Sequence, residues 1–143
     1  MVANDRKRIE AIEAIEAIAE KENIDNICKK VINIIKSYKV DLNDVNKSVR
    51  EAIENVCSFA YPDKKNGKIW INIYITKDRM LEIEICDFGC GINNVKKSQK
   101  KVYSTKRSLG VGFTYMEMFS DEMAVKSIPG KGTIVSLKFA ILY

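Results

Sequence analysis

The chain has 143 residues and no histidine, and its 24 Lys and Arg against 19 Asp and Glu give a formal net charge of +5. Without histidine it cannot use a Ser-His-Asp triad or a histidine-ligated metal, so acid–base chemistry falls to carboxylates, Lys, Tyr or Cys. The basic excess is local, because residues 88–116 contain no acidic residue and six basic ones: Lys96, Lys97, Lys100, Lys101, Lys106 and Arg107. Without these six, the balance is 18 against 19.

The cysteines and the hydropathy pattern indicate a single cytoplasmic domain. No CxxC pair occurs, which favours reduced core thiols over a zinc site. No apolar run approaches the roughly 18 residues of a membrane span, and the charged start MVANDRKRIE lacks the apolar core of a signal peptide. We therefore expect one domain over 1–143, with no membrane partner.

The N-terminal segment, 1–22, is ambiguous. Residues 5–20 carry a short Ile-Glu-Ala repeat whose Ala and Glu favour helix. A three-residue period, however, does not stay on one face of a 3.6-residue helix. Helix is expected for most of the segment, with an edge strand before Asn23 as the alternative.

Two amphipathic helices are expected next. Apolar residues from Ile24 to Tyr38 follow helical spacing, and a second helix starts near Asp41 or Asn43, either of which can cap it. Pro62 and the polar run that follows end the second helix.

The rest of the chain predicts a sheet. Strands are expected at 68–75, 81–86, 123–127 and 133–141, and a helix that Gly110 and Gly112 open is expected to run to Phe119. Helices first and then strands predict an α+β two-layer sandwich, a mixed, largely antiparallel sheet with helices on one face.

Three groups of residues suit ligand chemistry, although each is weak evidence alone. Glu51 and Asn55 share a helix face at i, i+4 spacing. Asp87 follows a strand and precedes two glycines, a place where a carboxylate can accept from an exocyclic amine. Gly110 and Gly112 open a helix whose N–H groups suit phosphate. Solvated helix residues and ordinary turns are the plain alternatives.

The order of these groups resembles the GHKL superfamily of gyrase, heat-shock chaperones and histidine kinases, which has the Bergerat ATP-binding fold. The matching pieces are ExxxN, DxGxG, GxG and GKGT, at Glu51, Asn55, Asp87, Gly89, Gly91, Gly110, Gly112 and Thr133. The resemblance covers residues 24–139. Within the superfamily the chain looks most like bacterial anti-sigma factor and switch serine-protein kinases, on the evidence of Tyr103-Ser-Thr-Lys, the run from Gly112 to Glu122, and the run from Lys126 to Thr133.

The resemblance implies a role for each matching residue. Asn55 would hold Mg²⁺ at the nucleotide phosphates, and Glu51 would be the catalytic base. Asp87 would receive the adenine amine, with Thr133 beside it. The glycines would let backbone N–H groups approach the nucleotide, and this cofactor-binding set comprises Asn55, Asp87, Gly89, Gly91, Ser108, Gly110, Gly112 and Thr133.

The basic segment, 93–109, lies where the superfamily places its ATP lid. Its cations could approach a triphosphate or an acidic partner, and a solvated loop is the plain alternative. Nucleic acid is not expected as a partner, because aromatic interleaving is limited to Tyr103.

Two features depart from the family. Many relatives carry a histidine shortly after the motif asparagine, where this chain has Ser58-Phe-Ala-Tyr61, and most begin with a clear strand.

The expected function is an ATP- and Mg²⁺-dependent serine/threonine kinase that phosphorylates an anti-anti-sigma-like regulatory protein, with a sigma factor as a further partner and a homodimer left open. The absence of dimerisation helices and of a phospho-accepting histidine favours this over a histidine kinase. The alternative is a non-catalytic module whose partner binding depends on ATP.

Overall fold

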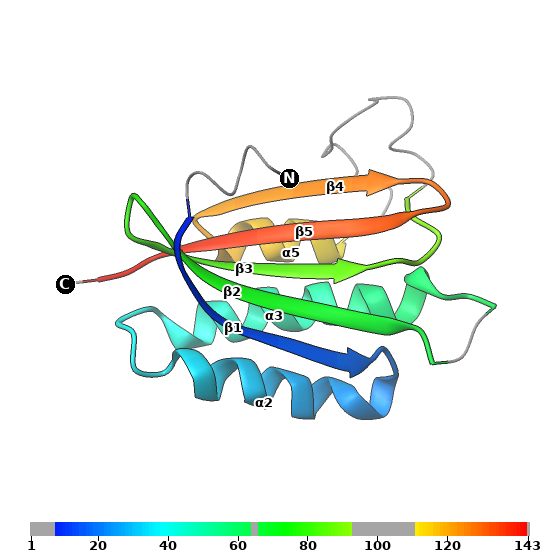
Figure 1. The fold of residues 1–143 in the computed structure, drawn as a ribbon, viewed down its shortest axis with the longest axis horizontal. Helices are drawn as coiled ribbons and strands as arrows, with labels where there is room; N and C mark the ends of the chain where they lie inside the picture. Colours follow the sequence, from blue (N-terminus) through cyan, green and yellow to red (C-terminus); the bar gives the residue numbers. More distant parts are fainter. Residues whose placement is uncertain (1–7, 64–65, 93–110, 143) are drawn as a thin grey trace.

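The computed structural model describes residues 8–63, 66–92 and 111–142, and they form two layers (Figure 1). The expected α+β sandwich is confirmed. Its elements in chain order are β1 (Arg8–Ile18), α2 (Ile24–Ile35), α3 (Leu42–Asn55), β2 (Lys68–Thr76), β3 (Met80–Asp87), α5 (Val111–Phe119), β4 (Glu122–Ile128) and β5 (Gly132–Ala140).

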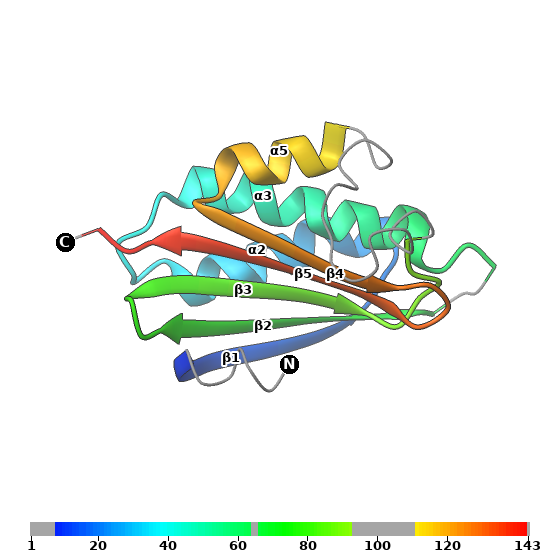
Figure 2. The ribbon, with the colours of Figure 1, turned by 90° about the horizontal axis from the view of Figure 1, so that it is seen from above.

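The sheet has five strands in the order β1-β2-β3-β5-β4, and the described pairs are all antiparallel. The three helices lie together on one face of the sheet (Figure 2). The core fills the space between the layers, and its fully buried side chains include Ile35, Ile53, Ile71, Ile83, Phe113, Met116 and Leu137. Over the described ranges, no helix is both long enough and apolar enough to cross a bilayer.

The first strand corrects the helix expected over residues 5–20. From Arg8 to Ile18 the chain is an edge strand paired with β2, so the edge-strand alternative was the right one. Two register shifts leave Ile9 and Ile12 without a paired residue in β2. These bulges absorb the mismatch between a three-residue repeat and a two-residue strand period, and Ile15 then faces the core opposite Ile71.

Helices α2 and α3 confirm the expected spacing and cap. Asp41 caps α3, since its side chain accepts a hydrogen bond from the Asp44 N–H at 3.1 Å. The apolar stripe of α3 is buried, including Val49 and Ile53. Helix α2 ends at Ile35, three residues before the expected end, and a π-helical turn (Val56–Ala60) continues α3.

Strand β3 departs from the expected pattern of one buried and one exposed face. Its alternating glutamates, Glu82 and Glu84, are buried as well as its isoleucines. Each glutamate accepts a hydrogen bond from a neighbouring strand, Glu82 from Ser136 at 2.8 Å and Glu84 from Asn72 at 3.1 Å. A central strand with polar partners on both sides can therefore bury its polar residues.

Tyr61 joins the end of the helical layer to two strands. Its hydroxyl donates to the Lys68 carbonyl at 2.6 Å and accepts from the Phe88 N–H at 3.0 Å. The ring lies where a Cβ on Gly67 would be, so only glycine fits there. Tyr61 thereby fixes the start of β2 and the loop after β3 relative to α3.

This network predicts a measurable effect of Tyr61→Phe. The substitution keeps the ring on Gly67 but leaves the Phe88 N–H and the Lys68 carbonyl without the hydroxyl, so we expect a loss of about 1 kcal/mol in urea unfolding. Trp70, the one tryptophan in the chain, contacts Phe88 edge to face with centroids 5.0 Å apart. Its emission should therefore change too. Tyr38→Phe, at the other end of the helical layer, is the control, and identical spectra and midpoints for both variants would contradict the prediction.

Candidate functional site

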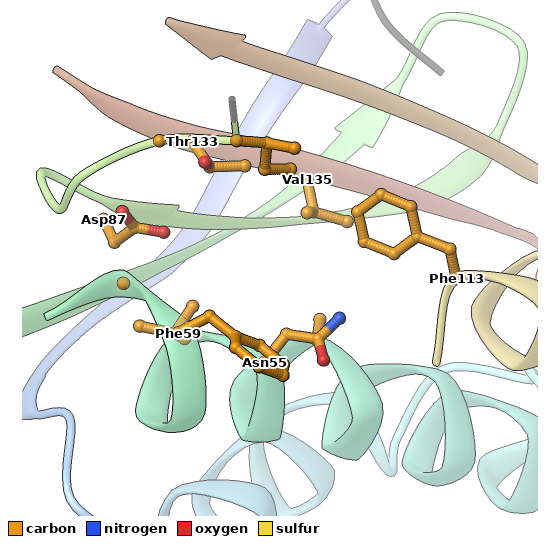
Figure 3. Close-up of a pocket in the computed structure, with 11 residues that line it drawn as sticks. Asn55, Phe59, Asp87, Phe113, Thr133 and Val135 are labelled. Atoms are coloured by element: carbon orange, nitrogen blue, oxygen red, sulfur yellow. The ribbon is translucent and has the colours of Figure 1, made fainter. Parts of the chain in front are cut away.

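A pocket lies between the helical and sheet layers, where α3 ends and β3 ends. Figure 3 shows Asp87 and Thr133 on the sheet side, and Asn55 and Phe59 on the helix side. The full lining is Ala52, Asn55, Val56, Phe59, Ala60, Asp87, Gly91, Ile92, Phe113, Thr133 and Val135. Its cavity volume is about 40 Å³, enough for a few water molecules, and its mouth is open to solvent.

Asp87 supplies a buried carboxylate at the sheet wall. It ends β3 directly opposite Thr133 of β5 and is 5% exposed. Its Oδ1 accepts the Gly89 N–H at 2.8 Å. Burial raises the pKa of Asp87, although hydrogen bonds from the backbone N–H groups of Gly89 and Thr133 oppose this shift. The carboxylate is therefore a desolvated acceptor, suited to a donor group on a ligand.

Asn55 supplies the opposing polar group. It is the last residue of α3, and its Nδ2 is buried with no hydrogen-bond partner among the residues that the structure describes. A buried amide without a partner costs free energy, so such a group in a pocket indicates a ligand that would pair with it. Its Oδ1 is also a ligand type that Mg²⁺ accepts.

Glu51 lies one helical turn before Asn55 and is half-buried, but it is not part of the pocket lining. Burial, followed by the nearby Glu54 carboxylate, raises the pKa of Glu51. The shared helix face predicted from the sequence thus places Asn55 in the pocket and Glu51 outside it. A raised pKa makes Glu51 a stronger base than an ordinary glutamate.

The glycines after Asp87 have a structural reason that the sequence did not reveal. A Cβ on Gly89 would meet the Ala60 carbonyl, and one on Gly91 would meet the Ile128 carbonyl. Gly91 also has φ +77°, which disfavours other residues. The Gly89 N–H donates to Asp87, and Gly89 packs against Ala60; its expected part in nucleotide binding stays a prediction.

Several expected residues fall outside the described residues or at their limit. Ser108, Gly110 and the expected lid, 93–109, lie outside them. Gly112 lies in the first turn of α5, which begins at Val111.

The apolar part of the pocket was not predicted. Phe113 and Val135 are buried in its wall, whereas Phe59 is 56% exposed. Phe59 lies in the run Ser58-Phe-Ala-Tyr61, where the sequence departs from the family that it resembles, and this departure was the available signal for it. Phe113 follows Gly112 directly, and Val135 lies two residues after Thr133 on the same strand face, but their meeting depends on how α5 packs.

The chain matches proteins of one family. The family model of the histidine kinase-like ATPase domain matches residues 6–139. An anti-sigma F factor of Clostridium acetobutylicum is 39% identical over 107 residues, covering 71% of this chain and 73% of that protein. An anti-sigma F factor of Priestia megaterium is 36% identical over 101 residues, covering 68% and 69%.

Solved structures agree on the fold. The crystal structure of the RsbU and RsbW domains of a Mycobacterium tuberculosis protein superposes with a TM-score of 0.64 at 13% identity, over 90% of this chain and 32% of that one. The histidine kinase domain of a blue-light activated kinase from Erythrobacter litoralis gives a TM-score of 0.57 at 15% identity, over 84% and 60%. The chain therefore belongs to the histidine kinase-like ATPase family and, within it, to the group of the bacterial anti-sigma factors.

Proposed function

We propose that this chain is an ATP-dependent serine/threonine protein kinase that phosphorylates a small regulatory protein of the anti-anti-sigma type. The observation that carries the proposal is the pocket itself. A buried Asp87 carboxylate lines one wall, and the buried, unpartnered amide of Asn55 lines the other. Family membership and the similarity to anti-sigma F factors support the same reading.

In this proposal different residues bind different parts of the nucleotide. Asp87 accepts the adenine amine, with Thr133 at its side, and the apolar Phe113 and Val135 cover the base. The Asn55 side chain would hold Mg²⁺, and the ion would supply positive charge to neutralise the phosphates. The basic segment after Ile92 supplies further cations of the sign that a triphosphate needs.

The small cavity volume sets a condition on binding. An adenine base does not fit in about 40 Å³, so side chains at the mouth have to turn outward. Phe59 is the side chain best able to do so, because it lines the pocket and yet is 56% exposed. Nucleotide binding should therefore be accompanied by a rotamer change of Phe59.

In this proposal Glu51 acts on the protein substrate and does not bind the nucleotide. It lies outside the pocket lining, one turn from Asn55, and its raised pKa suits proton transfer. In the proposed reaction it takes the proton from the partner's serine or threonine hydroxyl, whose oxygen attacks the terminal phosphorus. The bond from that phosphorus to the oxygen bridging it to the second phosphate breaks, and ADP leaves. A sigma factor is the second partner that the relatives' names suggest.

A second function has specific support. The same position of Glu51, together with Phe59 in the run that departs from the family pattern, is compatible with a nucleotide-sensing module that transfers no phosphate. In that case ATP would alter partner binding alone. Radiolabel transfer from ATP to the partner distinguishes the two functions.

Asp87→Asn should weaken ATP binding by about 10- to 100-fold in calorimetry, because an uncharged amide replaces the buried carboxylate acceptor. Burial raises the pKa of Asp87 in the folded, ligand-free protein above its ordinary value in the unfolded chain. The contribution of Asp87 to the free energy of unfolding is therefore complete below the ordinary pKa and is lost as the pH rises through the raised pKa. The substitution should therefore leave Tm at pH 7 undiminished. A fall in Tm that matches the loss of binding would instead indicate a damaged fold.

The same carboxylate predicts the pH dependence of binding. Accepting from the adenine amine needs the ionised form, so ATP affinity of the wild type should rise with pH through the raised pKa of Asp87 and then level off. In Asp87→Asn this rise should be absent, which separates it from titration of the nucleotide. Parallel profiles for the two proteins would remove Asp87 from the role.

Asn55→Ala should remove the advantage that Mg²⁺ gives to ATP binding. Calorimetry with Mg²⁺ and with EDTA measures it, and we expect the ratio of the two affinities to fall toward one. Asn72→Ala, which alters a sheet asparagine bonded to Glu84, is the control and should keep the wild-type ratio. An unchanged ratio in Asn55→Ala would place the metal elsewhere.

Glu51→Gln should keep ATP binding within about twofold, while phosphate transfer to the partner falls by about 10²- to 10⁴-fold, the usual contribution of a general base. Glu54→Gln, three residues further along α3, is the control; it removes only the smaller cause of the raised pKa of Glu51 and should retain most of the transfer. Transfer by Glu51→Gln at the wild-type rate would exclude Glu51 as the base. Absence of transfer in the wild type, with ATP binding intact, would favour the nucleotide-sensing module.

A further inference from the structure

A row of three polar side chains crosses the sheet beside the pocket. Asp87 of β3 pairs with Thr133 of β5, and Thr133 pairs with Ser127 of β4. Directly paired residues point to the same face of a sheet, here toward the helices. Asp87 and Thr133 line the pocket, whereas Ser127 lies behind them and is 6% exposed.

The Ser127 hydroxyl has three polar neighbours. The Ile92 N–H donates to its Oγ at 2.8 Å, the Gly132 carbonyl lies 3.2 Å away, and the Thr133 Oγ1 lies 2.7 Å away. Ile92 can only donate here, and the Gly132 carbonyl can only accept. Either hydroxyl can be the donor in the contact between Ser127 and Thr133.

Counting protons favours one direction for this contact. A serine hydroxyl has one proton to donate and lone pairs to accept with. All three contacts are hydrogen bonds only if Ser127 donates to the Gly132 carbonyl and Thr133 donates to Ser127. With the opposite choice, Ser127 would have no proton left for the Gly132 carbonyl at 3.2 Å, and one of the three hydrogen bonds would be lost.

The consequence concerns what Thr133 offers to the pocket. Its only proton is given to Ser127, so toward the pocket its hydroxyl presents lone pairs. The Asp87 carboxylate beside it is an acceptor too, which makes this wall entirely accepting. An amino group on a nucleobase edge matches such a wall, and a carbonyl there would face oxygens that offer it no proton.

We propose that Ser127 is a positioning residue that sets nucleobase selectivity, because it withholds the Thr133 proton from the pocket. This inference rests on the proposed nucleotide binding and adds a residue that touches no nucleotide. Without Ser127, the Thr133 hydroxyl rotates and can donate into the pocket. The protein then tolerates an oxo group where the wild type accepts only an amino group.

The test compares ATP with ITP, whose base has an oxo group in place of the amine. Calorimetry on the full chain gives the two dissociation constants and their ratio, ITP over ATP. We expect Ser127→Ala to lower this ratio about three- to tenfold, the value of one hydrogen bond. A general loss of structure would weaken both nucleotides together and leave the ratio unchanged.

Three further variants sharpen the result. Ser127→Thr keeps the hydroxyl and should restore the wild-type ratio, and Ser136→Ala, which removes a hydroxyl bonded to Glu82 on β5, should leave the ratio unchanged. Thr133→Val removes the group through which Ser127 acts. The double variant Ser127→Ala/Thr133→Val should therefore have the same ratio of ITP to ATP dissociation constants as Thr133→Val alone. This comparison still tests the proposal if Ser127→Ala is unstable.

The outcomes separate the two proposals. If wild type binds ATP and Ser127→Ala keeps the wild-type ratio, or if the two substitutions act independently, the role of Ser127 is overturned while the proposed function stands. If wild type binds neither nucleotide, the proposed function falls and this inference falls with it.

Discussion

The attachment of the loop after β3 to the end of the α3 helical run is the constraint on which the site depends. The Cys90 N–H donates to the Ala60 carbonyl at 2.8 Å, and the Tyr61 hydroxyl holds the Phe88 N–H. On its other side, the Cys90 carbonyl accepts the Gly130 N–H at 2.6 Å, from the turn between β4 and β5. One short loop therefore sets the spacing between the helix that carries Asn55 and the strand that carries Asp87.

This attachment explains why glycines follow Asp87. Backbone-to-backbone contact at Gly89 and Gly91 leaves no space for a Cβ, so the loop can lie between the helix end and the β4–β5 turn only without side chains there. At these two positions the glycines are therefore also a packing requirement, while Gly91 still lines the pocket. Asp87, Thr133 and Asn55 line the same pocket with polar side chains.

The wall of the pocket shows how hydrogen-bond partners orient buried polar side chains. Burial raises the pKa of Asp87, and hydrogen bonds from backbone N–H groups oppose this shift. Thr133 is oriented by a hydroxyl behind it. Among the described residues, only Asn55 has a buried side-chain N or O atom without a hydrogen-bond partner, and Asn55 lines the same pocket. A polar group left without a partner beside a cavity is what a preorganised binding site would provide.

The sequence by itself determined the features that depend on near neighbours: the Asp41 cap, the apolar stripes of α2 and α3, the strands after Pro62, and the order of motifs that identifies the family. A cap or a stripe needs only residues within about four positions, so local physics suffices. Only the tertiary structure decided that the Ile-Glu-Ala repeat is a strand, because pairing with β2 overrides helix propensity. Strand register also brought Ser127 to Thr133 and Thr133 to Asp87, and helix packing put Asn55 in the pocket and Glu51 outside it. These contacts join residues far apart in the chain, and no local pattern encodes them; that they bind a nucleotide stays a prediction.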